Sequence, residues 1–190
     1  MAKLFFRYAA MNAGKSTALL QVAYNYEERG HQVRIFTARL DDRYGSGYVT
    51  SRLGPQRVAE TFDAQTDFLA TFLEAGQLRP GVACVLVDEA QFLSATQVRA
   101  LHELAHLHGL PAICYGLRTD FRGELFPGSA MLLALADEMD EMKTICECGR
   151  KATMNMRLDA SMRRVTEGAQ VDVGGNARYR AVCGRCFRQG

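Results

Sequence analysis

The first residues that could do chemistry form a short loop near the N-terminus. A strand-like run at residues 4–8 precedes the loop and a helical run at residues 17–28 follows it. The loop consists of Ala9, Ala10, Met11, Asn12, Ala13, Gly14, Lys15 and Ser16. It fits G-x-x-x-x-G-K-[ST] except at its first position, where alanine replaces glycine. In such loops backbone N–H groups and a helix N-terminus bind phosphates, the lysine neutralises charge and the serine ligates Mg²⁺. The alternative interpretation is a plain helix start at Gly14.

Two carboxylates follow an apolar run further along the chain. Asp88 and Glu89 come directly after residues 84–87, a strand-like sequence of cysteine, valine and leucine. Open α/β sheets bind their ligands at the carboxyl ends of the strands, where these two side chains would lie. A helix-capping pair is the alternative. Together with the loop, the pair predicts an Asp88 that organises Mg²⁺ and a Glu89 that acts as a base. Ala90 and Gln91 continue the same predicted nucleotide site.

The six cysteines divide into two groups. Cys84 and Cys114 lie within apolar runs, so we expect them to be small hydrophobic residues of buried strands. The other four form a C-x-C and a C-x-x-C pair, and these are Cys146, Cys148, Cys183 and Cys186. Close thiol pairs without a secretory signal are more often metal ligands than disulfides, and four thiolates suit structural Zn²⁺. Free thiols, or a zinc ribbon that binds nucleic acid, are the alternatives.

A metalloprotease-like pattern also occurs, from His102 to His106. H-E-x-x-H can place two imidazoles on one helical face, but the third ligand position of the longer motif is Ala112. The predicted apolar stripe of this helix is Val98, Leu101 and Ala105, which leaves Arg99, His102, Glu103 and His106 on its outward face. A solvated helical face therefore explains the pattern.

The elements that must position these groups alternate along the chain. Strand-like runs occur at residues 4–8, 33–37, 82–87 and 112–116. Between them we expect helices that end at Gly30 and at Gly76, and a third that starts at Ser94 and stops at Gly109. Alternation of this kind favours a parallel sheet with helices on both faces. The predicted fold class is therefore α/β.

Composition and charge suggest a main domain and a smaller unit. The 190 residues are 48% hydrophobic, enough for one core. Residues 1–142 carry 13 basic and 17 acidic side chains, whereas residues 143–190 carry 10 and 4. The basic part could meet a polyanion, either nucleic acid or nucleotide phosphates, or be a solvated surface. No run approaches the roughly 18 apolar residues of a membrane span, so we expect a soluble, unprocessed cytoplasmic protein with no membrane partner.

Several of these motifs together resemble the type II thymidine kinases, in particular the bacterial members, over nearly the whole chain. The matching segments are residues 9–16, 88–92 and 116–121, the cysteine quartet and residues 173–179. The resemblance implies a P-loop NTPase-like kinase domain over residues 1–142 and a zinc-binding lasso domain over residues 143–190. It also implies an enzyme that uses ATP and Mg²⁺ to phosphorylate thymidine to dTMP. The same resemblance implies a homotetramer with no nucleic-acid partner.

The resemblance also assigns roles to individual residues. Glu89 matches the proton acceptor and Asp88 a residue of the nucleotide site. Positions that match the surroundings of the nucleoside are Met11, Leu117, Phe121, Gln170, Val171, Asp172, Val173, Gly174 and Tyr179. Tyr179 matches the tyrosine that closes over the base, while Asp41 and Arg43 match a loop near the phosphates. Cys186 departs from relatives that carry histidine there, a change that Zn²⁺ tolerates.

Two other function classes remain open from the motifs. Asp88, Glu89, Ala90 and Gln91 also fit a D-E-x-x box, which is typical of P-loop ATPases that act on nucleic acid. A helicase motor needs a second domain, which 190 residues cannot supply. Nucleic-acid-stimulated ATP hydrolysis without nucleoside phosphorylation would favour that class. A zinc-ribbon module would instead show salt-dependent nucleic-acid binding and no turnover.

Overall fold

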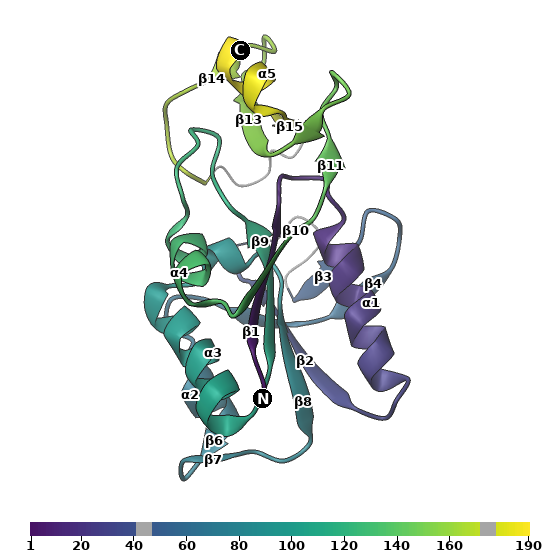
Figure 1. Ribbon diagram of the computed structural model, residues 1–190, viewed down its shortest axis with the longest axis vertical. Helices are drawn as coiled ribbons and strands as arrows, with labels where there is room; N and C mark the ends of the chain where they lie inside the picture. The colour runs from purple at the N-terminus through teal and green to yellow at the C-terminus, as the bar shows by residue number, and fades with distance from the viewer. Residues whose placement is uncertain (41–46, 172–177) are drawn as a thin grey trace.

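A parallel β-sheet forms the centre of the protein in a computed structural model that describes residues 1–40, 47–171 and 178–190 (Figure 1). Within these residues the main sheet has six strands, in the spatial order β10 (Glu138–Glu141), β1 (Leu4–Ala9), β9 (Ala112–Leu117), β8 (Val82–Val87), β2 (Gln32–Ala38) and β5 (Glu60–Phe62). Every neighbouring pair runs parallel. The predicted α/β class is confirmed.

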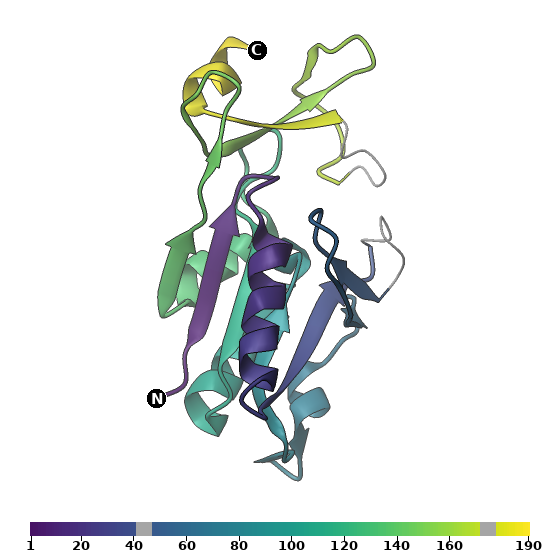
Figure 2. The same cartoon turned by 90° about the vertical axis from the view of Figure 1, so that its right-hand side faces the viewer.

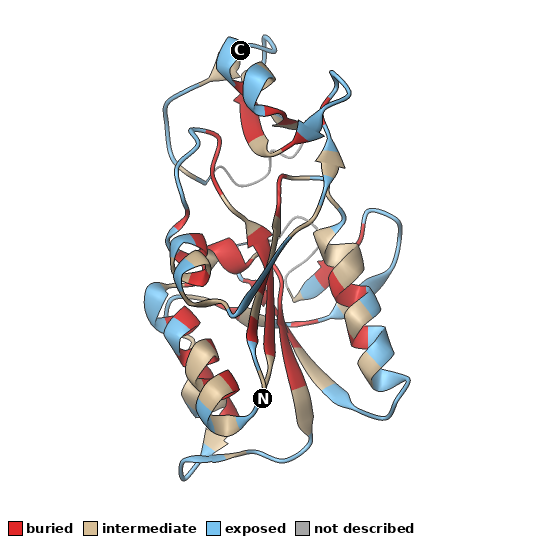
Figure 3. Ribbon diagram, viewed as in Figure 1, coloured by how far each residue is buried: buried red, intermediate tan, exposed pale blue. Residues whose placement is uncertain are grey.

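Helices cover both faces of this sheet, as the alternation of elements predicted (Figure 1). Helix α1 (Lys15–Glu27) lies on one face, beside the hairpin of β3 (Tyr48–Thr50) and β4 (Gln56–Val58). On the other face lie α2 (Phe68–Phe72), η1 (Ala90–Phe92), α3 (Ala95–His108) and α4 (Pro127–Leu135). Buried residues are concentrated along the sheet between these layers (Figure 3). Cys84 and Cys114 are buried on opposite faces, and burial raises the pKa of both thiols, so they are hydrophobic residues of the core, as expected.

Two parts of this domain differ from the sequence-based expectation. The prediction of a helix that ends at Gly76 is wrong. Helix α2 ends at Phe72, and a hairpin of β6 (Leu73–Glu74) and β7 (Gln77–Leu78) follows it. Ala75 and Gly76 form its turn with φ of 50° and 77°, the left-handed conformation that closes a two-residue hairpin. Helix α1 ends at Glu27, short of Gly30.

Helix α3 follows the predicted boundaries closely. The Ser94 hydroxyl and the Gln97 side chain form a capping box, and Gly109 ends the helix with φ of 71°. Val98, Leu101 and Ala105 are buried. On the outward side, the His106 Nε2 atom lies 3.0 Å from the Asp137 Oδ2 atom. The H-E-x-x-H pattern is therefore part of a helix whose apolar stripe faces the core.

A smaller unit lies beyond the carboxyl ends of the main strands (Figure 1). It contains a hairpin of β11 (Thr144–Ile145) and β12 (Lys151–Ala152), a sheet in the order β14 (Arg164–Val165), β13 (Met154–Leu158) and β15 (Tyr179–Val182), and helix α5 (Gly184–Gln189). Met156, Val182 and Phe187 pack with two cysteines in its own core. Among the described residues, no helix combines the length and apolar character needed to cross a membrane.

Candidate functional site

The predicted phosphate loop connects the central strand β1 to helix α1. Ala9 is the last residue of the strand and does not have a positive φ, which explains why alanine is compatible with the first position of the motif. Asn12 and Gly14 both have positive φ, 63° and 78°, and Gly14 caps the helix. Asparagine and glycine tolerate this left-handed conformation best. The Lys15 ammonium reaches back across the loop and donates to the Ala10 carbonyl at 3.3 Å.

A cavity of about 350 Å³ opens at this loop. Its wall consists of residues 11–17, residues 50–53, Glu89 and Leu117. The fold thus brings the predicted loop, the predicted base and two predicted nucleoside contacts, Met11 and Leu117, to one place. The remaining predicted nucleotide-site residues are buried and are not part of this wall, and these are Ala9, Ala10, Asp88, Ala90 and Gln91. Such a volume is in the usual range of small-molecule sites.

Asp88 lies at the end of β8 and is only 5% exposed. It accepts hydrogen bonds from the Ser16 hydroxyl at 2.9 Å and from the Glu89 N–H at 3.0 Å. Burial raises the pKa of Asp88, the neighbouring Glu89 charge raises it further, and Ser16 and Lys15 oppose the shift. A hydroxyl and a buried carboxylate next to a phosphate loop are the donor set that Mg²⁺ uses in such sites. The residues present therefore fit the predicted ion.

Replacing Asp88 with asparagine should stabilise the protein in the absence of ligands. The carboxyl pKa is raised in the folded state, so ionisation costs folding free energy above about pH 4 and the cost grows as the pH rises through the folded pKa. We expect Asp88→Asn to raise the free energy of unfolding by roughly 1 to 3 kcal/mol near pH 8 and by little near pH 4. Denaturant titrations at both pH values measure this. Asp140→Asn, at an exposed position of β10, is the control, and destabilisation by Asp88→Asn at both pH values would contradict the argument.

Glu89 has a strained backbone next to the cavity. Its φ and ψ are 52° and 38°, an uncommon conformation for a residue other than glycine. The Gln91 side chain donates to the Glu89 carboxylate and accepts from the Leu117 N–H at 3.0 Å. A Cβ at Gly116 would lie 2.9 Å from the Gln91 amide oxygen, so this close packing requires glycine. Gln91 therefore fixes the Glu89 side chain relative to Leu117.

Asn155 on β13 links the two units and was not predicted from the sequence. Its side-chain oxygen accepts from the Met11 N–H at 2.8 Å, and its amide donates to the Thr119 carbonyl at 3.2 Å. The phosphate loop is thus joined to the smaller unit through this buried amide, and the Thr144 hydroxyl of β11 also donates to the Asn12 carbonyl at 3.3 Å. The only available signal was a polar residue between Met154 and Met156 in a strand.

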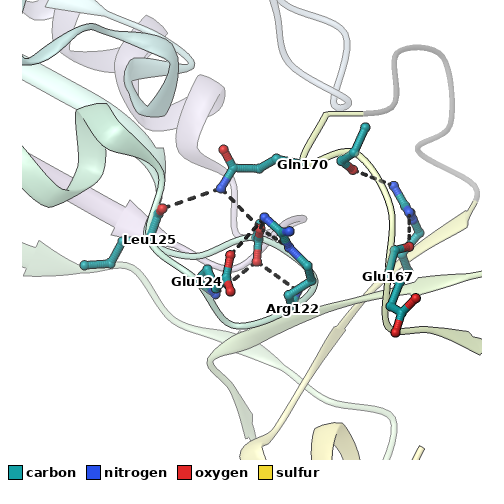
Figure 4. A network of polar contacts seen from close by, with 8 residues as sticks. Arg122, Glu124, Leu125, Glu167 and Gln170 are labelled. Carbon is teal, nitrogen blue, oxygen red and sulfur yellow. Dashed lines mark hydrogen bonds and ion pairs between the residues drawn. The ribbon is translucent and has the colours of Figure 1, made fainter.

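The segment before residue 171 is tied to the loop that follows β9 (Figure 4). Gln170 donates to the Asp120 carboxylate at 3.2 Å and to the Leu125 carbonyl at 3.5 Å. Asp120 also binds Arg122 and the N–H groups of Arg122 and Glu124. These hydrogen bonds outweigh desolvation and lower the pKa of Asp120. The carboxylate therefore stays charged and holds together the loop after β9 and the segment that contains Gln170.

Arg157 makes a second tie between the same two segments. Its guanidinium lies 3.7 Å from the centre of the Phe121 ring and donates to the carbonyls of Ala169 and Glu167, each at 3.0 Å. Arg157 is 8% exposed and Phe121 is 1% exposed. A Cβ at Gly168 would lie 2.6 Å from this guanidinium, so the segment packs tightly against it. Sequence reasoning did not identify Arg157, because an arginine in a basic segment resembles a surface residue.

The structure places the other predicted nucleoside contacts in different settings. Met11 and Leu117 line the cavity, whereas Phe121 and Gln170 lie in the network around Asp120 and Arg157. Val171 is exposed, and Tyr179 is half-buried at the start of β15. Asp172, Val173 and Gly174, and likewise Asp41 and Arg43, lie outside the described residues.

The four predicted metal ligands converge in the smaller unit. The Sγ atoms of Cys146, Cys148, Cys183 and Cys186 all lie within 4.8 Å of one another. Zn–S bonds of about 2.3 Å in a tetrahedron require sulfur separations of about 3.8 Å, and Cys148 and Cys183 lie 3.6 Å apart. Backbone N–H groups lower the pKa of Cys146 and Cys183, which favours thiolates there, whereas hydrogen bonds with the other three thiols raise the pKa of Cys186. The donor set thus fits a structural zinc ion.

Comparison with known proteins agrees with this site. The thymidine kinase family model matches residues 2–187. A thymidine kinase of Chromobacterium violaceum is 62% identical over 187 residues, which cover 98% of each chain. A thymidine kinase of Albidiferax ferrireducens is 56% identical over 187 residues, 98% of this chain and 92% of its own. One of Jannaschia sp. is 54% identical over 189 residues, 100% of this chain and 96% of its own. The chain therefore belongs to the thymidine kinase family.

Proposed function

We propose that this protein transfers the γ-phosphate of ATP to the 5′-hydroxyl of thymidine and so forms dTMP. The observation that carries the proposal is the cavity in which the phosphate loop, Glu89 and Leu117 meet. Phosphoryl transfer depends mainly on positioning and on neutralisation of charge, and it needs a group that accepts the proton of the attacking hydroxyl. Membership of the thymidine kinase family supports this choice of phosphate acceptor.

The residues of the cavity have distinct roles in this mechanism. The N–H groups at the start of α1 and the Lys15 ammonium bind the phosphates of ATP. Ser16 and Asp88 would hold Mg²⁺, which supplies positive charge to the phosphate oxygens when it is bound. Glu89 accepts the proton from the 5′-hydroxyl, and Gln91 keeps the Glu89 carboxylate in place for this step.

We place thymidine on the side of the cavity that faces the smaller unit. Met11 and Leu117 border the base, and Tyr179 closes over it together with the segment from Gln170 to Gly174. The contacts of Gln170 with Asp120 and of Arg157 with residues 167 and 169 support this arrangement, because they fix the start of that segment. Residues 1–142 then form the kinase domain and residues 143–190 the zinc-binding lasso domain.

The same proposal includes the cellular setting of the enzyme. Zn²⁺ bound by the four cysteines would stabilise the smaller unit without taking part in the transfer. We propose a homotetramer in the cytoplasm with no nucleic-acid partner. In this proposal, the excess basic residues of the smaller unit either contact nucleotide phosphates or are exposed to solvent.

A nucleoside panel tests the proposal. Purified protein with labelled ATP and Mg²⁺ should phosphorylate thymidine and leave the purine nucleosides unchanged, and metal analysis should find one zinc per chain. ATP hydrolysis that depends on added nucleic acid, without any nucleoside phosphorylation, would instead indicate an ATPase with a D-E-x-x box. Size-exclusion chromatography with light scattering measures the oligomeric state.

Arg157→Ala should weaken thymidine binding more than ATP binding. The substitution removes a desolvated cation–π contact and leaves the carbonyls of residues 167 and 169 without this donor, so residues 167–170 lose their fixed position. We expect the KM for thymidine to rise about tenfold and the KM for ATP to change less than about twofold. Arg157→Lys should restore little, because one ammonium cannot stack on Phe121 and reach both carbonyls.

Arg180→Ala is the matched control for this experiment. Arg180 pairs with Met156 on the neighbouring strand, but its side chain forms an exposed ion pair with Glu147. Exposed pairs contribute little, so this variant should behave as wild type. Equal changes in both KM values for Arg157→Ala would show that Arg157 supports the fold in general and not the thymidine side.

A further inference from the structure

The hairpin between β3 and β4 brings a turn to the edge of the phosphate cavity (Figure 2). Ser51 anchors this turn, because its hydroxyl shares a 2.6 Å hydrogen bond with Thr17 on α1, 34 residues away in the sequence. The same hydroxyl accepts from the Leu53 N–H, and the Ser51 main chain binds Pro55 and Gly54. Ser51 is 2% exposed and Val49 before it is in the core. The turn is therefore fixed against the helix that begins at the phosphate loop.

Arg52 is the next residue, and its surroundings differ from those of the neighbouring arginines. It lines the cavity and is exposed, and no described residue forms a hydrogen bond or an ion pair with it. Arg57 on the same hairpin pairs with Glu27, and Arg34 pairs with Glu60. The backbone thus fixes Arg52 at the cavity, while its guanidinium has no described protein partner. This positive charge is available to an anionic ligand.

A second polar group on the same wall also lacks a partner. The Thr50 hydroxyl is buried and makes no hydrogen bond to any described residue, although Thr50 borders the cavity. Buried polar atoms are nearly always paired, so an unpaired one at the edge of a site needs an explanation. Because that oxygen has almost no accessible surface, a ligand in the cavity cannot reach it unless the side chain rotates, so Arg52 is the group that places an anion next to the hairpin.

We propose that Arg52 is a further catalytic residue that binds the phosphate oxygens of ATP from the hairpin turn that borders the cavity. The proposal rests on the kinase function proposed above and adds a residue that the loop motif does not contain. In the transfer, the bond between the γ-phosphorus and the bridging oxygen breaks and a bond to the 5′-oxygen forms, while Glu89 takes the hydroxyl proton. Negative charge on the bridging oxygen and on the transferred group is then offset by Arg52.

The chemistry of the guanidinium suits this role. It remains charged at any relevant pH and offers several N–H groups in a planar fork, which binds phosphate oxygens with two parallel hydrogen bonds. Lys15, by contrast, contributes a single point charge. Charge that is placed in advance around a transferring phosphoryl group lowers the barrier, since no reorganisation is needed during the reaction.

Kinetic comparison of three variants tests the proposal. We expect Arg52→Ala to lower kcat/KM for ATP about 10- to 100-fold, mainly through kcat, with the KM for thymidine changed less than about threefold. Arg52→Lys should recover part of the loss, because it keeps the charge but not the fork. Arg57→Ala is the control on the same hairpin, and it should stay within about threefold of wild type because an exposed ion pair contributes little.

The outcomes separate this inference from the proposed function. If the wild-type protein phosphorylates thymidine and Arg52→Ala keeps full activity, the role of Arg52 is overturned and the proposed function stands. Equal losses in Arg52→Ala and Arg57→Ala would also overturn it, since the hairpin would then act only through its structure. Melting temperatures of all variants show whether the fold is retained. A wild-type protein that phosphorylates no nucleoside would instead remove the proposed function.

Discussion

Replacing Glu89 with glutamine is expected to reduce turnover by about two to four orders of magnitude, because the variant has no group that accepts the 5′-hydroxyl proton. In the wild-type protein the Gln91 amide donates a hydrogen bond to the Glu89 carboxylate. The glutamine side chain of the variant has the same size and can accept the same hydrogen bond. ATP binding should change little, because the loop and Lys15 are intact. Steady-state kinetics with separate ATP titrations measure both quantities.

A matched substitution sharpens this prediction. Glu74→Gln, at an exposed position of the β6–β7 hairpin, makes the same chemical change away from the cavity and should leave turnover unchanged. Turnover of Glu89→Gln close to wild type would show that another group, or water, accepts the proton.

The sequence predicted the central strands well because their signal is local. Residues 82–87 and 112–116 are continuous apolar runs, which is typical of parallel strands buried on both faces. The edge strand β10 carries Glu138, Asp140 and Glu141, so it has no apolar run and only its pairing with β1 makes it a strand. The helix expected before Gly76 failed for a similar reason, since pairing between Leu73 and Leu78 outweighs helical propensity.

The chemistry of the site was predictable only where a motif is contiguous. Residues 11–16, Glu89 and Leu117 meet in one cavity, because strand ends of a parallel sheet share an edge. Ser51, Asn155 and Arg157 reach their partners through contacts between segments far apart in the chain. Nothing in their local sequence distinguishes them from ordinary polar residues. Their roles follow from burial and hydrogen bonding, which a single sequence does not contain.

The second large effect is expected for Lys15→Ala, which should weaken ATP binding and turnover together. Lys15 lies at the first position of α1, and its ammonium bonds to Ala10 across the loop. Its charge acts on the phosphates both in the bound complex and during transfer, so its loss affects both stages. We expect kcat/KM for ATP to fall about 10²- to 10³-fold, with a weaker affinity for ATP.

The variant also reports on the neighbouring carboxylate. The Lys15 charge opposes the raised pKa of Asp88, so its removal should raise that pKa further and shift the Mg²⁺ concentration at which the residual activity is half-maximal. Lys3→Ala is the matched control, since Lys3 forms an exposed ion pair with Glu138 just before the other end of β1. Titrations of ATP and Mg²⁺ on both variants distinguish the loss of phosphate binding from a change in the metal site. If ATP affinity and rate were both unchanged in Lys15→Ala, residues 9–16 would not bind the nucleotide, and the cavity would need another ligand.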